Sequence, residues 1–329
     1  MMKEALFYHR TEQGKLLCEL CPKYCVISEG KRGFCYARIN QGGVLYSEIY
    51  GRAMAAAVDP IEKKPLYHFH PGSSIFSIGT RGCNQRCDFC QNYHMLSSDA
   101  PLEEISVAWA VDKAVEAGSV GIAYTYNEPL IWYEFLAECA PAARARGLKN
   151  VLVTNGFINP EPFRELAPHI DAMNIDVKSM DGSFYRDICK SELPPVLETC
   201  RAARAGGIHL EITNLVIPTL NDSDEHFRKL AAFVAELGRD VPLHFSAYYP
   251  CYKMTIPATP LETLRRGAAV ARQVLDYVYL GNVRTDEGSD TLCPGCGNIL
   301  VRRDGYSASL PGLAGNDCAN CGRHADVIL

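Results

Sequence analysis

The sequence lacks long apolar runs. Among its 329 residues, no stretch reaches the ~18 apolar residues that a transmembrane helix needs. The opening segment, MMKEALFYHRTEQGK, carries charges where a secretory signal would have its apolar core. We therefore expect neither a membrane-spanning helix nor secretion, and we predict a cytoplasmic protein that binds no membrane.

The sequence also lacks an excess of positive charge. Its formal net charge is -5, so electrostatics do not support a non-specific nucleic-acid or membrane binder. There is no internal repeat, no low-complexity tract and no phosphate-cradling glycine loop of the P-loop kind. With 47% hydrophobic and 22% charged residues, the composition is that of an ordinary globular protein. At this length we expect one large domain with appendages.

Cysteine, by contrast, is abundant, with 15 residues. In a reducing compartment so many cysteines are rarely disulfides, and clustered ones indicate metal sites. Most of them fall in three groups: Cys18, Cys21, Cys25 and Cys35; Cys83, Cys87 and Cys90; and Cys293, Cys296, Cys318 and Cys321. The others are isolated, and two of these, Cys139 and Cys200, fit small positions in a hydrophobic core.

The middle of the chain alternates between apolar β-branched runs and helical patterns. We expect strands at 74–80, 121–126, 150–156, 171–179, 209–217 and 242–250. We expect helices at 102–117, 129–146, 160–168, 193–205 and 223–238, then a further helix at 260–278 and a last strand at 278–282. This alternation predicts βαβ units and a parallel sheet, either an open or partial barrel or a doubly wound sheet. Reactive groups then gather at the carboxyl ends of the strands.

The two ends of the chain do not follow this rhythm. Before residue 59 the chain is irregular, apart from a strand pattern at GGVLYSEIYG and a knot of four cysteines. From residue 286 a short tail rich in Cys, Gly and Pro takes over. We therefore predict three parts: an N-terminal metal-binding segment (1–58), an α/β body (59–285) and a C-terminal module (286–329).

The stretch SIGTRGCNQRCDFCQNYHM places Cys83, Cys87 and Cys90 directly after the first strand of the α/β body. Three thiols are one ligand short of a structural zinc site, and an iron–sulfur cube has four irons to ligate. The spacing thus leaves one coordination position open, as catalytic metals do. Gly79 and Gly82 would let the backbone wrap closely around a bulky inorganic centre.

These motifs resemble a known family. C-x3-C-x2-C after a first strand, with the aromatic Phe89 before the last cysteine, resembles the signature of radical S-adenosylmethionine (SAM) enzymes. With KPLYHFHPGS, YTYNEP, VTNGF and NIDVKSMD, it resembles the AmmeMemoRadiSam-system radical SAM enzymes, relatives of pyruvate formate-lyase activating enzymes, along nearly the whole chain. The resemblance implies an α/β fold, a partial (β/α)6 radical SAM barrel with small cysteine-rich metal-binding modules at both ends.

The resemblance also implies the chemistry. A [4Fe-4S] cluster on Cys83, Cys87 and Cys90 would bind S-adenosyl-L-methionine at its open iron and supply the electron that cleaves it. The products would be methionine and a 5′-deoxyadenosyl radical, which takes a hydrogen atom from the substrate. A flavodoxin- or ferredoxin-type reductant would deliver the electron. The protein's part is to orient these groups and keep solvent away from reactive intermediates.

Two polar residues at the ends of later strands are candidate cofactor contacts. By resemblance, Glu128 in YTYNEP accepts a hydrogen bond from the SAM ammonium, although its charge would also suit a helix N-terminus. Asn155 in VTNG could contact the ribose or the carboxylate, although Asn-Gly is also a good turn.

Further candidates lie on the fourth and sixth strands. Alternation places Asp176 and Lys178 on the same face, where charges are costly to desolvate and suit a zwitterionic ligand. The resemblance places both near SAM or substrate, with Lys178 also a catalytic candidate; a buried salt bridge is the structural alternative. Phe89 and His244 complete the set, although a hydrogen-bonded core role fits His244 equally well. Cys251 is considered as a hydrogen-atom donor.

The two outer cysteine groups differ in spacing. Cys293, Cys296, Cys318 and Cys321 form two C-x2-C knuckles, which predict a closed structural zinc ribbon with a rubredoxin-type iron centre as the minor alternative. Three arginines against four aspartates in residues 288–329 argue against nucleic-acid binding. The first group, Cys18, Cys21, Cys25 and Cys35, suits zinc or a second iron–sulfur cluster; zinc and a structural role are slightly favoured, since a metal would stabilise a segment with little core.

These observations predict a radical SAM enzyme that abstracts hydrogen from an unidentified substrate, with a protein or peptide as one candidate. A glycyl-radical-enzyme activase is the nearest alternative. A non-catalytic, metal-stapled scaffold that binds partner proteins is the alternative from another class, and the open three-cysteine site argues against it.

Overall fold

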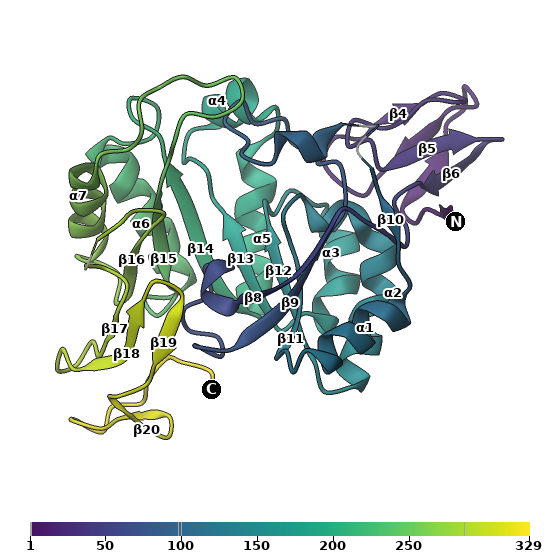
Figure 1. Cartoon of the computed structure of the whole chain (residues 1–329). Helices are drawn as coiled ribbons and strands as arrows, with labels where there is room; N and C mark the ends of the chain where they lie inside the picture. The colour runs from purple at the N-terminus through teal and green to yellow at the C-terminus, as the bar shows by residue number, and fades with distance from the viewer. Residues whose placement is uncertain (1, 98, 100, 286) are drawn as a thin grey trace.

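The computed structural model describes residues 2–97, 99, 101–285 and 287–329. Its centre is one eight-stranded sheet (Figure 1). In spatial order its strands are β16 (Val278–Gly281), β15 (Leu243–Ala247), β14 (His209–Val216), β13 (Ala172–Asp176), β12 (Lys149–Thr154), β11 (Gly121–Tyr124), β9 (Ser74–Gly79) and β8 (Ala55–Pro60). All neighbouring pairs are parallel except β8–β9, which is antiparallel. The strands therefore end at one common edge, where parallel sheets carry their sites.

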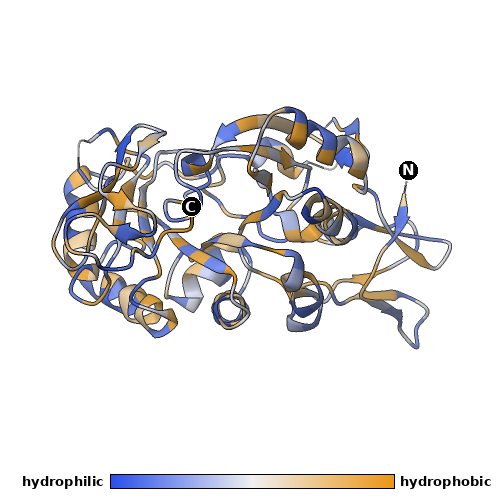
Figure 2. Cartoon of the chain, turned by 90° about the horizontal axis from the view of Figure 1, so that it is seen from below, coloured by the Kyte–Doolittle hydropathy of each residue, from blue (hydrophilic) through white to orange (hydrophobic). Residues whose placement is uncertain are grey.

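Helices cover the outer side of this sheet (Figure 1). They are α1 (Val107–Glu116), α2 (Tyr133–Ala145), α3 (Pro160–Leu166), α5 (Leu193–Ala205), α6 (Asp224–Leu237) and α7 (Leu261–Ala271). Figure 2 shows hydrophobic and hydrophilic residues alternating along these helices, as expected where one face packs on the sheet and the other meets water. None of the helices in the described part of the chain is both long and apolar enough to cross a membrane.

The predicted α/β body with a mainly parallel sheet is confirmed. Each expected strand is present, shortened by up to four residues. The helix expected at 260–278 ends at Ala271, because the chain must turn before β16 begins at Val278. The edge strand β8 was not expected: its AAAV run consists of small residues and is mostly exposed, and it therefore has no alternation to indicate a strand.

The N-terminal segment is more regular than its sequence suggests. One small sheet contains β1 (Lys3–Glu4), β6 (Val44–Ser47) and β5 (Arg38–Gln41). A second contains β2 (Tyr8–Arg10), β3 (Leu16–Cys18) and β4 (Val26–Ile27). β8 runs across the boundary expected at residue 58, so the chain joins the central sheet before that point.

The C-terminal module is built from hairpins: β17 (Thr291–Leu292), β18 (Ile299–Asp304), β19 (Ser307–Ser309), β20 (Leu313–Ala314) and β21 (Asp317–Cys318). Arg303 of β18 is buried and donates to Thr291 Oγ1 at 2.9 Å and to the Tyr67 carbonyl. Its guanidinium also lies 3.8 Å from Glu62. The module is thus anchored in the α/β body by a buried, charged junction.

Candidate active site

The three-cysteine loop leaves β9 at the carboxyl edge of the sheet. Gly82 has φ +89°, and a Cβ there would overlap the Cys35 carbonyl oxygen. At Gly79 a Cβ would overlap the Thr125 carbonyl oxygen. Both glycines are therefore required for close approach of backbone to backbone, whereas the sequence suggested that they make room for an inorganic centre.

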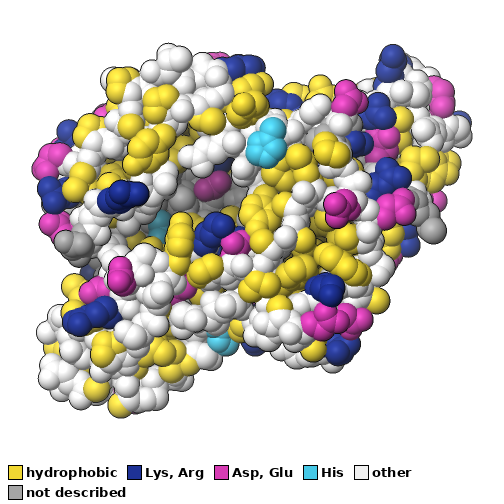
Figure 3. Space-filling view, viewed as in Figure 1, with side chains coloured by type: hydrophobic (Ala, Val, Ile, Leu, Met, Phe, Trp, Pro, Cys, Tyr) yellow, Lys and Arg dark blue, Asp and Glu magenta, His cyan; other side chains and the backbone are white. Residues whose placement is uncertain are grey.

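The loop opens onto a cavity of about 1420 Å³, measured out to its mouth. Figure 3 shows this face of the molecule hollowed, with acidic and basic side chains in and beside the hollow. The sequence-predicted residues that line the cavity are Cys83, Cys87, Phe89, Cys90, Glu128, Asn155, Asp176 and Lys178. Segments up to 95 residues apart in the chain thus meet at one edge of the sheet.

The thiols of the loop are held by their surroundings. The backbone N–H of Gln85 donates to Cys83 Sγ at 3.3 Å, and Asn155 Nδ2 approaches the same sulfur at 3.6 Å. Cys189, which the sequence left isolated, lies against Cys87; that neighbour and burial raise the pKa of the Cys87 thiol. Burial also raises the pKa of Cys90 to about 11. The loop therefore presents neutral thiols that lose protons when they bind a metal.

Glu128 is a buried carboxylate four residues after the end of β11. It accepts hydrogen bonds from Thr154 Oγ1 at 2.6 Å, the Asn155 N–H at 2.8 Å and the Leu130 N–H at 2.9 Å. Burial raises its pKa to about 7, and these hydrogen bonds offset only part of that shift. Both sequence interpretations thus apply, since Glu128 caps a short helical turn through Leu130 and also lines the cavity.

Two asparagines fix the cavity wall. Asn155 donates to Asn84 Oδ1 at 2.9 Å, and its own Oδ1 accepts from the Phe157 N–H at 2.9 Å, which closes a turn. Asn127, which sequence reasoning missed, accepts from the Thr80 N–H at 3.1 Å and donates to the Gly82 carbonyl at 2.9 Å. Asn127 therefore ties the start of the cysteine loop to the adjacent strand; its position inside YTYNEP was the signal that could have found it.

Lys178 and Asp176 form an ion pair at the cavity, 2.9 Å apart. Burial opposes the charge on Lys178, but Asp176 and the thiols of Cys87 and Cys189 outweigh it and raise the lysine pKa. The Lys178 ammonium also lies 5.9 Å from the centre of the Phe89 ring. The pair leaves Asp176 about a third exposed, so it presents opposite charges to a ligand in the cavity.

His244 lies elsewhere. Its Nε2 is 2.6 Å from Glu211 Oε2, below the cavity, and its ring stacks on Tyr279. Of the residues on β15, Ser246 reaches the cavity and His244 does not. Alternation correctly predicts the face of the sheet but not the depth along the strand, so the structure does not bring His244 together with the other candidates. Cys251 Sγ lies 3.7 Å from the Cys90 carbonyl oxygen, behind the cavity lining.

A further group of charged and polar residues at the cavity, Lys64, Asp59 and Tyr126, was missed. Lys64 forms an ion pair with Asp59 at 2.6 Å, and the Tyr126 hydroxyl donates to the same carboxylate at 2.7 Å. Burial disfavours the charged carboxylate, but these bonds outweigh it and hold the Asp59 pKa far below its usual range. Lys64 and Tyr126 line the cavity. Lys64 is the first residue of the KPLYHFHPGS motif, which forms part of the family resemblance without singling out this lysine.

The site fits the cofactors that the motifs imply. Three thiols on one loop face a space large enough for a nucleotide, and they are one ligand short of a closed centre. Gln85 Nε2 and Thr213 Oγ1 belong to residues that line this space, and both atoms are buried without a hydrogen-bond partner within the described residues. Such groups are costly unless a ligand satisfies them.

The C-terminal cysteines are arranged differently. Cys293 Sγ lies 3.6 Å from Cys321 Sγ, and Cys296 Sγ lies 3.7 Å from Cys318 Sγ. All four sulfurs lie within 4.8 Å of one another. The predicted closed metal site at this end of the chain is therefore geometrically formed and could hold one ion.

Comparisons with known proteins agree with this geometry. Residues 77–233 match the radical SAM superfamily. A protein of Methanocaldococcus jannaschii, named Uncharacterized protein MJ0808, is 43% identical over 336 residues, covering 100% of both chains. The pyruvate formate-lyase-activating enzyme of Clostridium pasteurianum is 24% identical over 48% of this chain and 68% of its own.

Solved structures show the same fold. A radical SAM methyltransferase from Sphaerobacter thermophilus superimposes with a TM-score of 0.51 at 16% identity, covering 67% of this chain and 69% of that one. The match to this domain argues against the hypothesis that the protein is a non-catalytic scaffold. Residues 77–233 are a radical SAM domain, and the chain is a radical SAM enzyme with homology to the pyruvate formate-lyase-activating enzymes.

Proposed function

We propose that this enzyme cleaves SAM reductively and uses the 5′-deoxyadenosyl radical to abstract a hydrogen atom from a protein or peptide substrate. The observation that carries the proposal is the open cavity into which Cys83, Cys87 and Cys90 face together with Glu128 and the other predicted contacts. A bound [4Fe-4S] cluster would supply the electron for cleavage and the coordination position for the methionine part of SAM.

The protein's own residues complement a zwitterion. We assign the Glu128 carboxylate to the SAM ammonium, because it is buried and can accept a further hydrogen bond beside the three it already receives. We assign Lys178 to a carboxylate or the substrate, held in place by Asp176. Asn155 positions both the turn after β12 and the Cys83 thiol. These groups stand on strand ends, which hold geometry better than free loops.

We infer the setting of the reaction from the same features. All cysteines of the chain are free thiols in the structure, which supports a reducing, cytoplasmic compartment. A flavodoxin- or ferredoxin-type protein is the proposed source of the electron. The motifs around the cavity support membership of the AmmeMemoRadiSam system, whose other proteins are then candidate partners. We propose zinc for the C-terminal site, because its sulfurs converge on one tetrahedral position.

Activation of a glycyl radical enzyme is the second candidate. The observation that favours it is the similarity to activating enzymes, which include that of 4-hydroxyphenylacetate decarboxylase from Clostridium scatologenes at 30% identity over 35% of this chain. In that case the hydrogen donor would be a backbone glycine of a large partner enzyme.

One experiment tests the proposal and separates the two candidates. The anaerobically reconstituted, reduced protein is incubated with SAM and deuterated candidate partner proteins, and 5′-deoxyadenosine is quantified by mass spectrometry. We expect 5′-deoxyadenosine, with deuterium transferred from the true substrate. A stable glycyl radical in the partner's electron paramagnetic resonance (EPR) spectrum would select the activase. Absence of SAM cleavage by cluster-loaded protein would overturn the proposal.

A further inference from the structure

Sulfur spacing distinguishes one metal ion from a cluster. In a tetrahedral site with metal–sulfur bonds of about 2.3 Å, neighbouring sulfurs lie about 3.8 Å apart. The C-terminal distances of 3.6 and 3.7 Å match this value. In an iron–sulfur cube each thiolate binds a different iron, so the four sulfurs must stand farther apart around a space.

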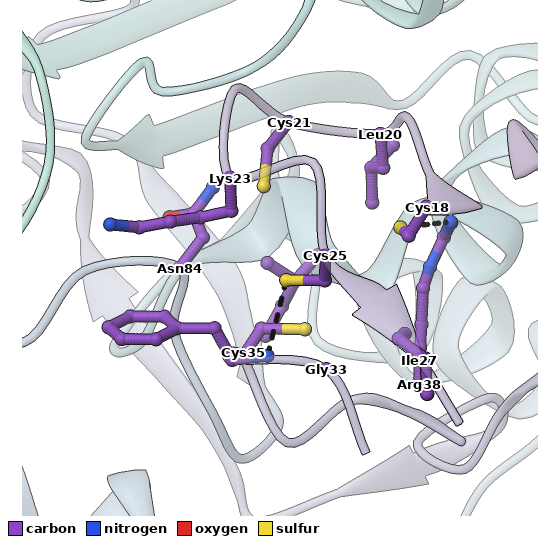
Figure 4. A pocket seen from close by; sticks show the side chains of 12 residues that line it. Cys18, Leu20, Cys21, Lys23, Cys25, Ile27, Gly33, Cys35, Arg38 and Asn84 are labelled. Atoms are coloured by element: carbon purple, nitrogen blue, oxygen red, sulfur yellow. Dashed lines mark hydrogen bonds between the residues drawn. The ribbon is translucent and has the colours of Figure 1, made fainter. Parts of the chain in front are cut away.

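The N-terminal cysteines follow the second pattern. Cys18, Cys21, Cys25 and Cys35 line one small cavity, and Figure 4 shows their sulfurs distributed around it. Within the described residues, the C-terminal group is the one set of three or more potential ligands whose atoms all lie within 4.8 Å of one another. The sulfurs of the N-terminal group, like those of the three-cysteine loop, therefore do not converge as the sulfurs of the C-terminal group do.

The surroundings of this cavity suit an anionic sulfur centre. Arg38 is fully buried and donates from Nη1 to Cys18 Sγ at 3.4 Å, while the Phe34 N–H donates to Cys25 Sγ at 3.4 Å (Figure 4). Lys23 also lines the cavity. The buried carboxylate of Glu134 pairs with Arg38 and keeps it in position. Hydrogen bonds to sulfur and nearby charge are the means by which proteins tune iron–sulfur clusters.

The cavity lies directly behind the catalytic loop. Gly82 packs on the Cys35 carbonyl so closely that a Cβ cannot fit between them. Asn84, from the catalytic loop, lines the N-terminal cavity. Arg86 donates to the Cys83 carbonyl at 2.6 Å and also to the Phe34 carbonyl. Arg86 thus links the turn that carries Cys83 to the turn that carries Cys35.

We propose that Cys18, Cys21, Cys25 and Cys35 bind a second, fully protein-ligated iron–sulfur cluster of the [4Fe-4S] class, adjoining the catalytic one. This reverses the slight preference for zinc that the sequence supports. Four thiolates leave no open iron, so this centre does not bind SAM, in contrast to the centre on Cys83, Cys87 and Cys90.

The test uses the full chain with Cys83, Cys87 and Cys90 all changed to alanine, so that the catalytic centre cannot contribute. The protein is reconstituted anaerobically with iron and sulfide, and iron, acid-labile sulfide and zinc are measured per chain. We expect about four iron and about four sulfide, a brown charge-transfer absorbance, and an EPR signal after reduction. These measurements do not depend on SAM cleavage, so they are independent of the proposed reaction.

Two further variants in that background locate the cluster. Cys21→Ser with Cys25→Ser should remove the iron and sulfide, whereas the matched pair Cys318→Ser with Cys321→Ser should retain them. If the first pair does not fold, Mössbauer spectroscopy of the ⁵⁷Fe-reconstituted natural sequence replaces it, with about eight clustered irons expected and about four if the proposal is wrong. Zinc without sulfide in the triple-alanine protein would overturn the proposal.

Discussion

The C-terminal cysteine group and the cysteine loop after β9 present thiols in opposite ways. At the C-terminus four sulfurs converge within 4.8 Å, and two of the four residues, Cys296 and Cys321, are exposed. After β9 three thiols line the wall of a large cavity. Four converging thiolates fill the tetrahedral coordination sphere of an ion, so no further ligand can bind to it. Three thiolates leave one coordination position for a ligand.

The two regions also differ in what surrounds them. The catalytic loop is bordered by a buried carboxylate, an ion pair and buried polar atoms that have no hydrogen-bond partner among the described residues. Around the C-terminal group lies a small apolar cluster with Leu300, Val301 and Val327. Unsatisfied polar groups in a cavity indicate ligand binding, while an apolar shell around thiolates indicates a structural role. The surroundings therefore indicate a reactive role for the region around the three-cysteine loop and a structural role for the C-terminal group.

The largest effect is expected from removing the catalytic thiols. Changing Cys83, Cys87 and Cys90 to alanine should lower the rate of SAM cleavage by a factor of at least ~10³, because the site then lacks every protein ligand of the proposed cluster. The measurement is 5′-deoxyadenosine formed per chain under anaerobic reduction. The Cys318→Ser, Cys321→Ser protein serves as the comparison and should cleave SAM within about twofold of the natural rate at a temperature where it is folded. Equal losses in both variants would erase the distinction between the two regions.

A smaller effect is expected from Glu128. Glu128→Gln keeps the shape and one of the two acceptor oxygens but removes the charge, so SAM should bind about 10- to 100-fold more weakly, the range for a hydrogen bond to a charged group. Equilibrium binding of SAM to the oxidised, cluster-loaded protein provides the measurement. Glu138→Gln, on the exposed side of α2, is the matched control and should leave affinity unchanged.

The affinity for SAM should also depend on pH. Burial raises the pKa of Glu128 to about 7, so its carboxylate is charged above that pH and neutral below it. The charged form attracts the SAM ammonium; the dissociation constant should therefore rise by up to about tenfold per unit as pH falls below 7. Binding by Glu128→Gln should be flatter over the same range. If the pH profiles of the two proteins coincide, Glu128 does not contact the ammonium.

Much of this reactive region follows from the sequence. Glu128, Asn155 and Asp176 each stand at or just after the end of a parallel strand, and parallel strands bring their carboxyl ends to one edge. Alternation then predicts which face each residue occupies. It does not predict depth, and His244 shows the consequence, since it points to the correct face two residues below Ser246 and bonds Glu211.

Other contacts were beyond local patterns. Cys189 meets Cys87 because it is the last residue of a π-helical turn, Tyr185–Cys189, which Lys190 terminates with φ +55°. Lys64 begins the KPLYHFHPGS motif, but nothing in that motif indicates that its side chain reaches the cavity. The junction of Arg303 with Tyr67 joins residues 236 positions apart. Long-range contacts of this kind depend on how whole elements pack, and no window of the sequence contains that information.

The smallest effect on SAM chemistry is expected from the junction that holds the C-terminal module. Arg303→Ala would remove hydrogen bonds to Thr291, Ser289 and Tyr67 and would leave Glu62 buried without its cation. Breaking a buried charged pair costs about 3–5 kcal/mol, so the midpoint of thermal unfolding should fall by several degrees.

Arg302, the adjacent residue on β18, is exposed and provides the matched control. Arg302→Ala should change the free energy of unfolding by no more than ~0.5 kcal/mol. SAM cleavage by folded Arg303→Ala should remain within about twofold of the natural rate, because the arginine touches no residue of the cavity wall in these contacts. A large loss of cleavage with unchanged stability would mean that the supporting end of the fold acts on the reactive one, and the division between the two regions would then be wrong.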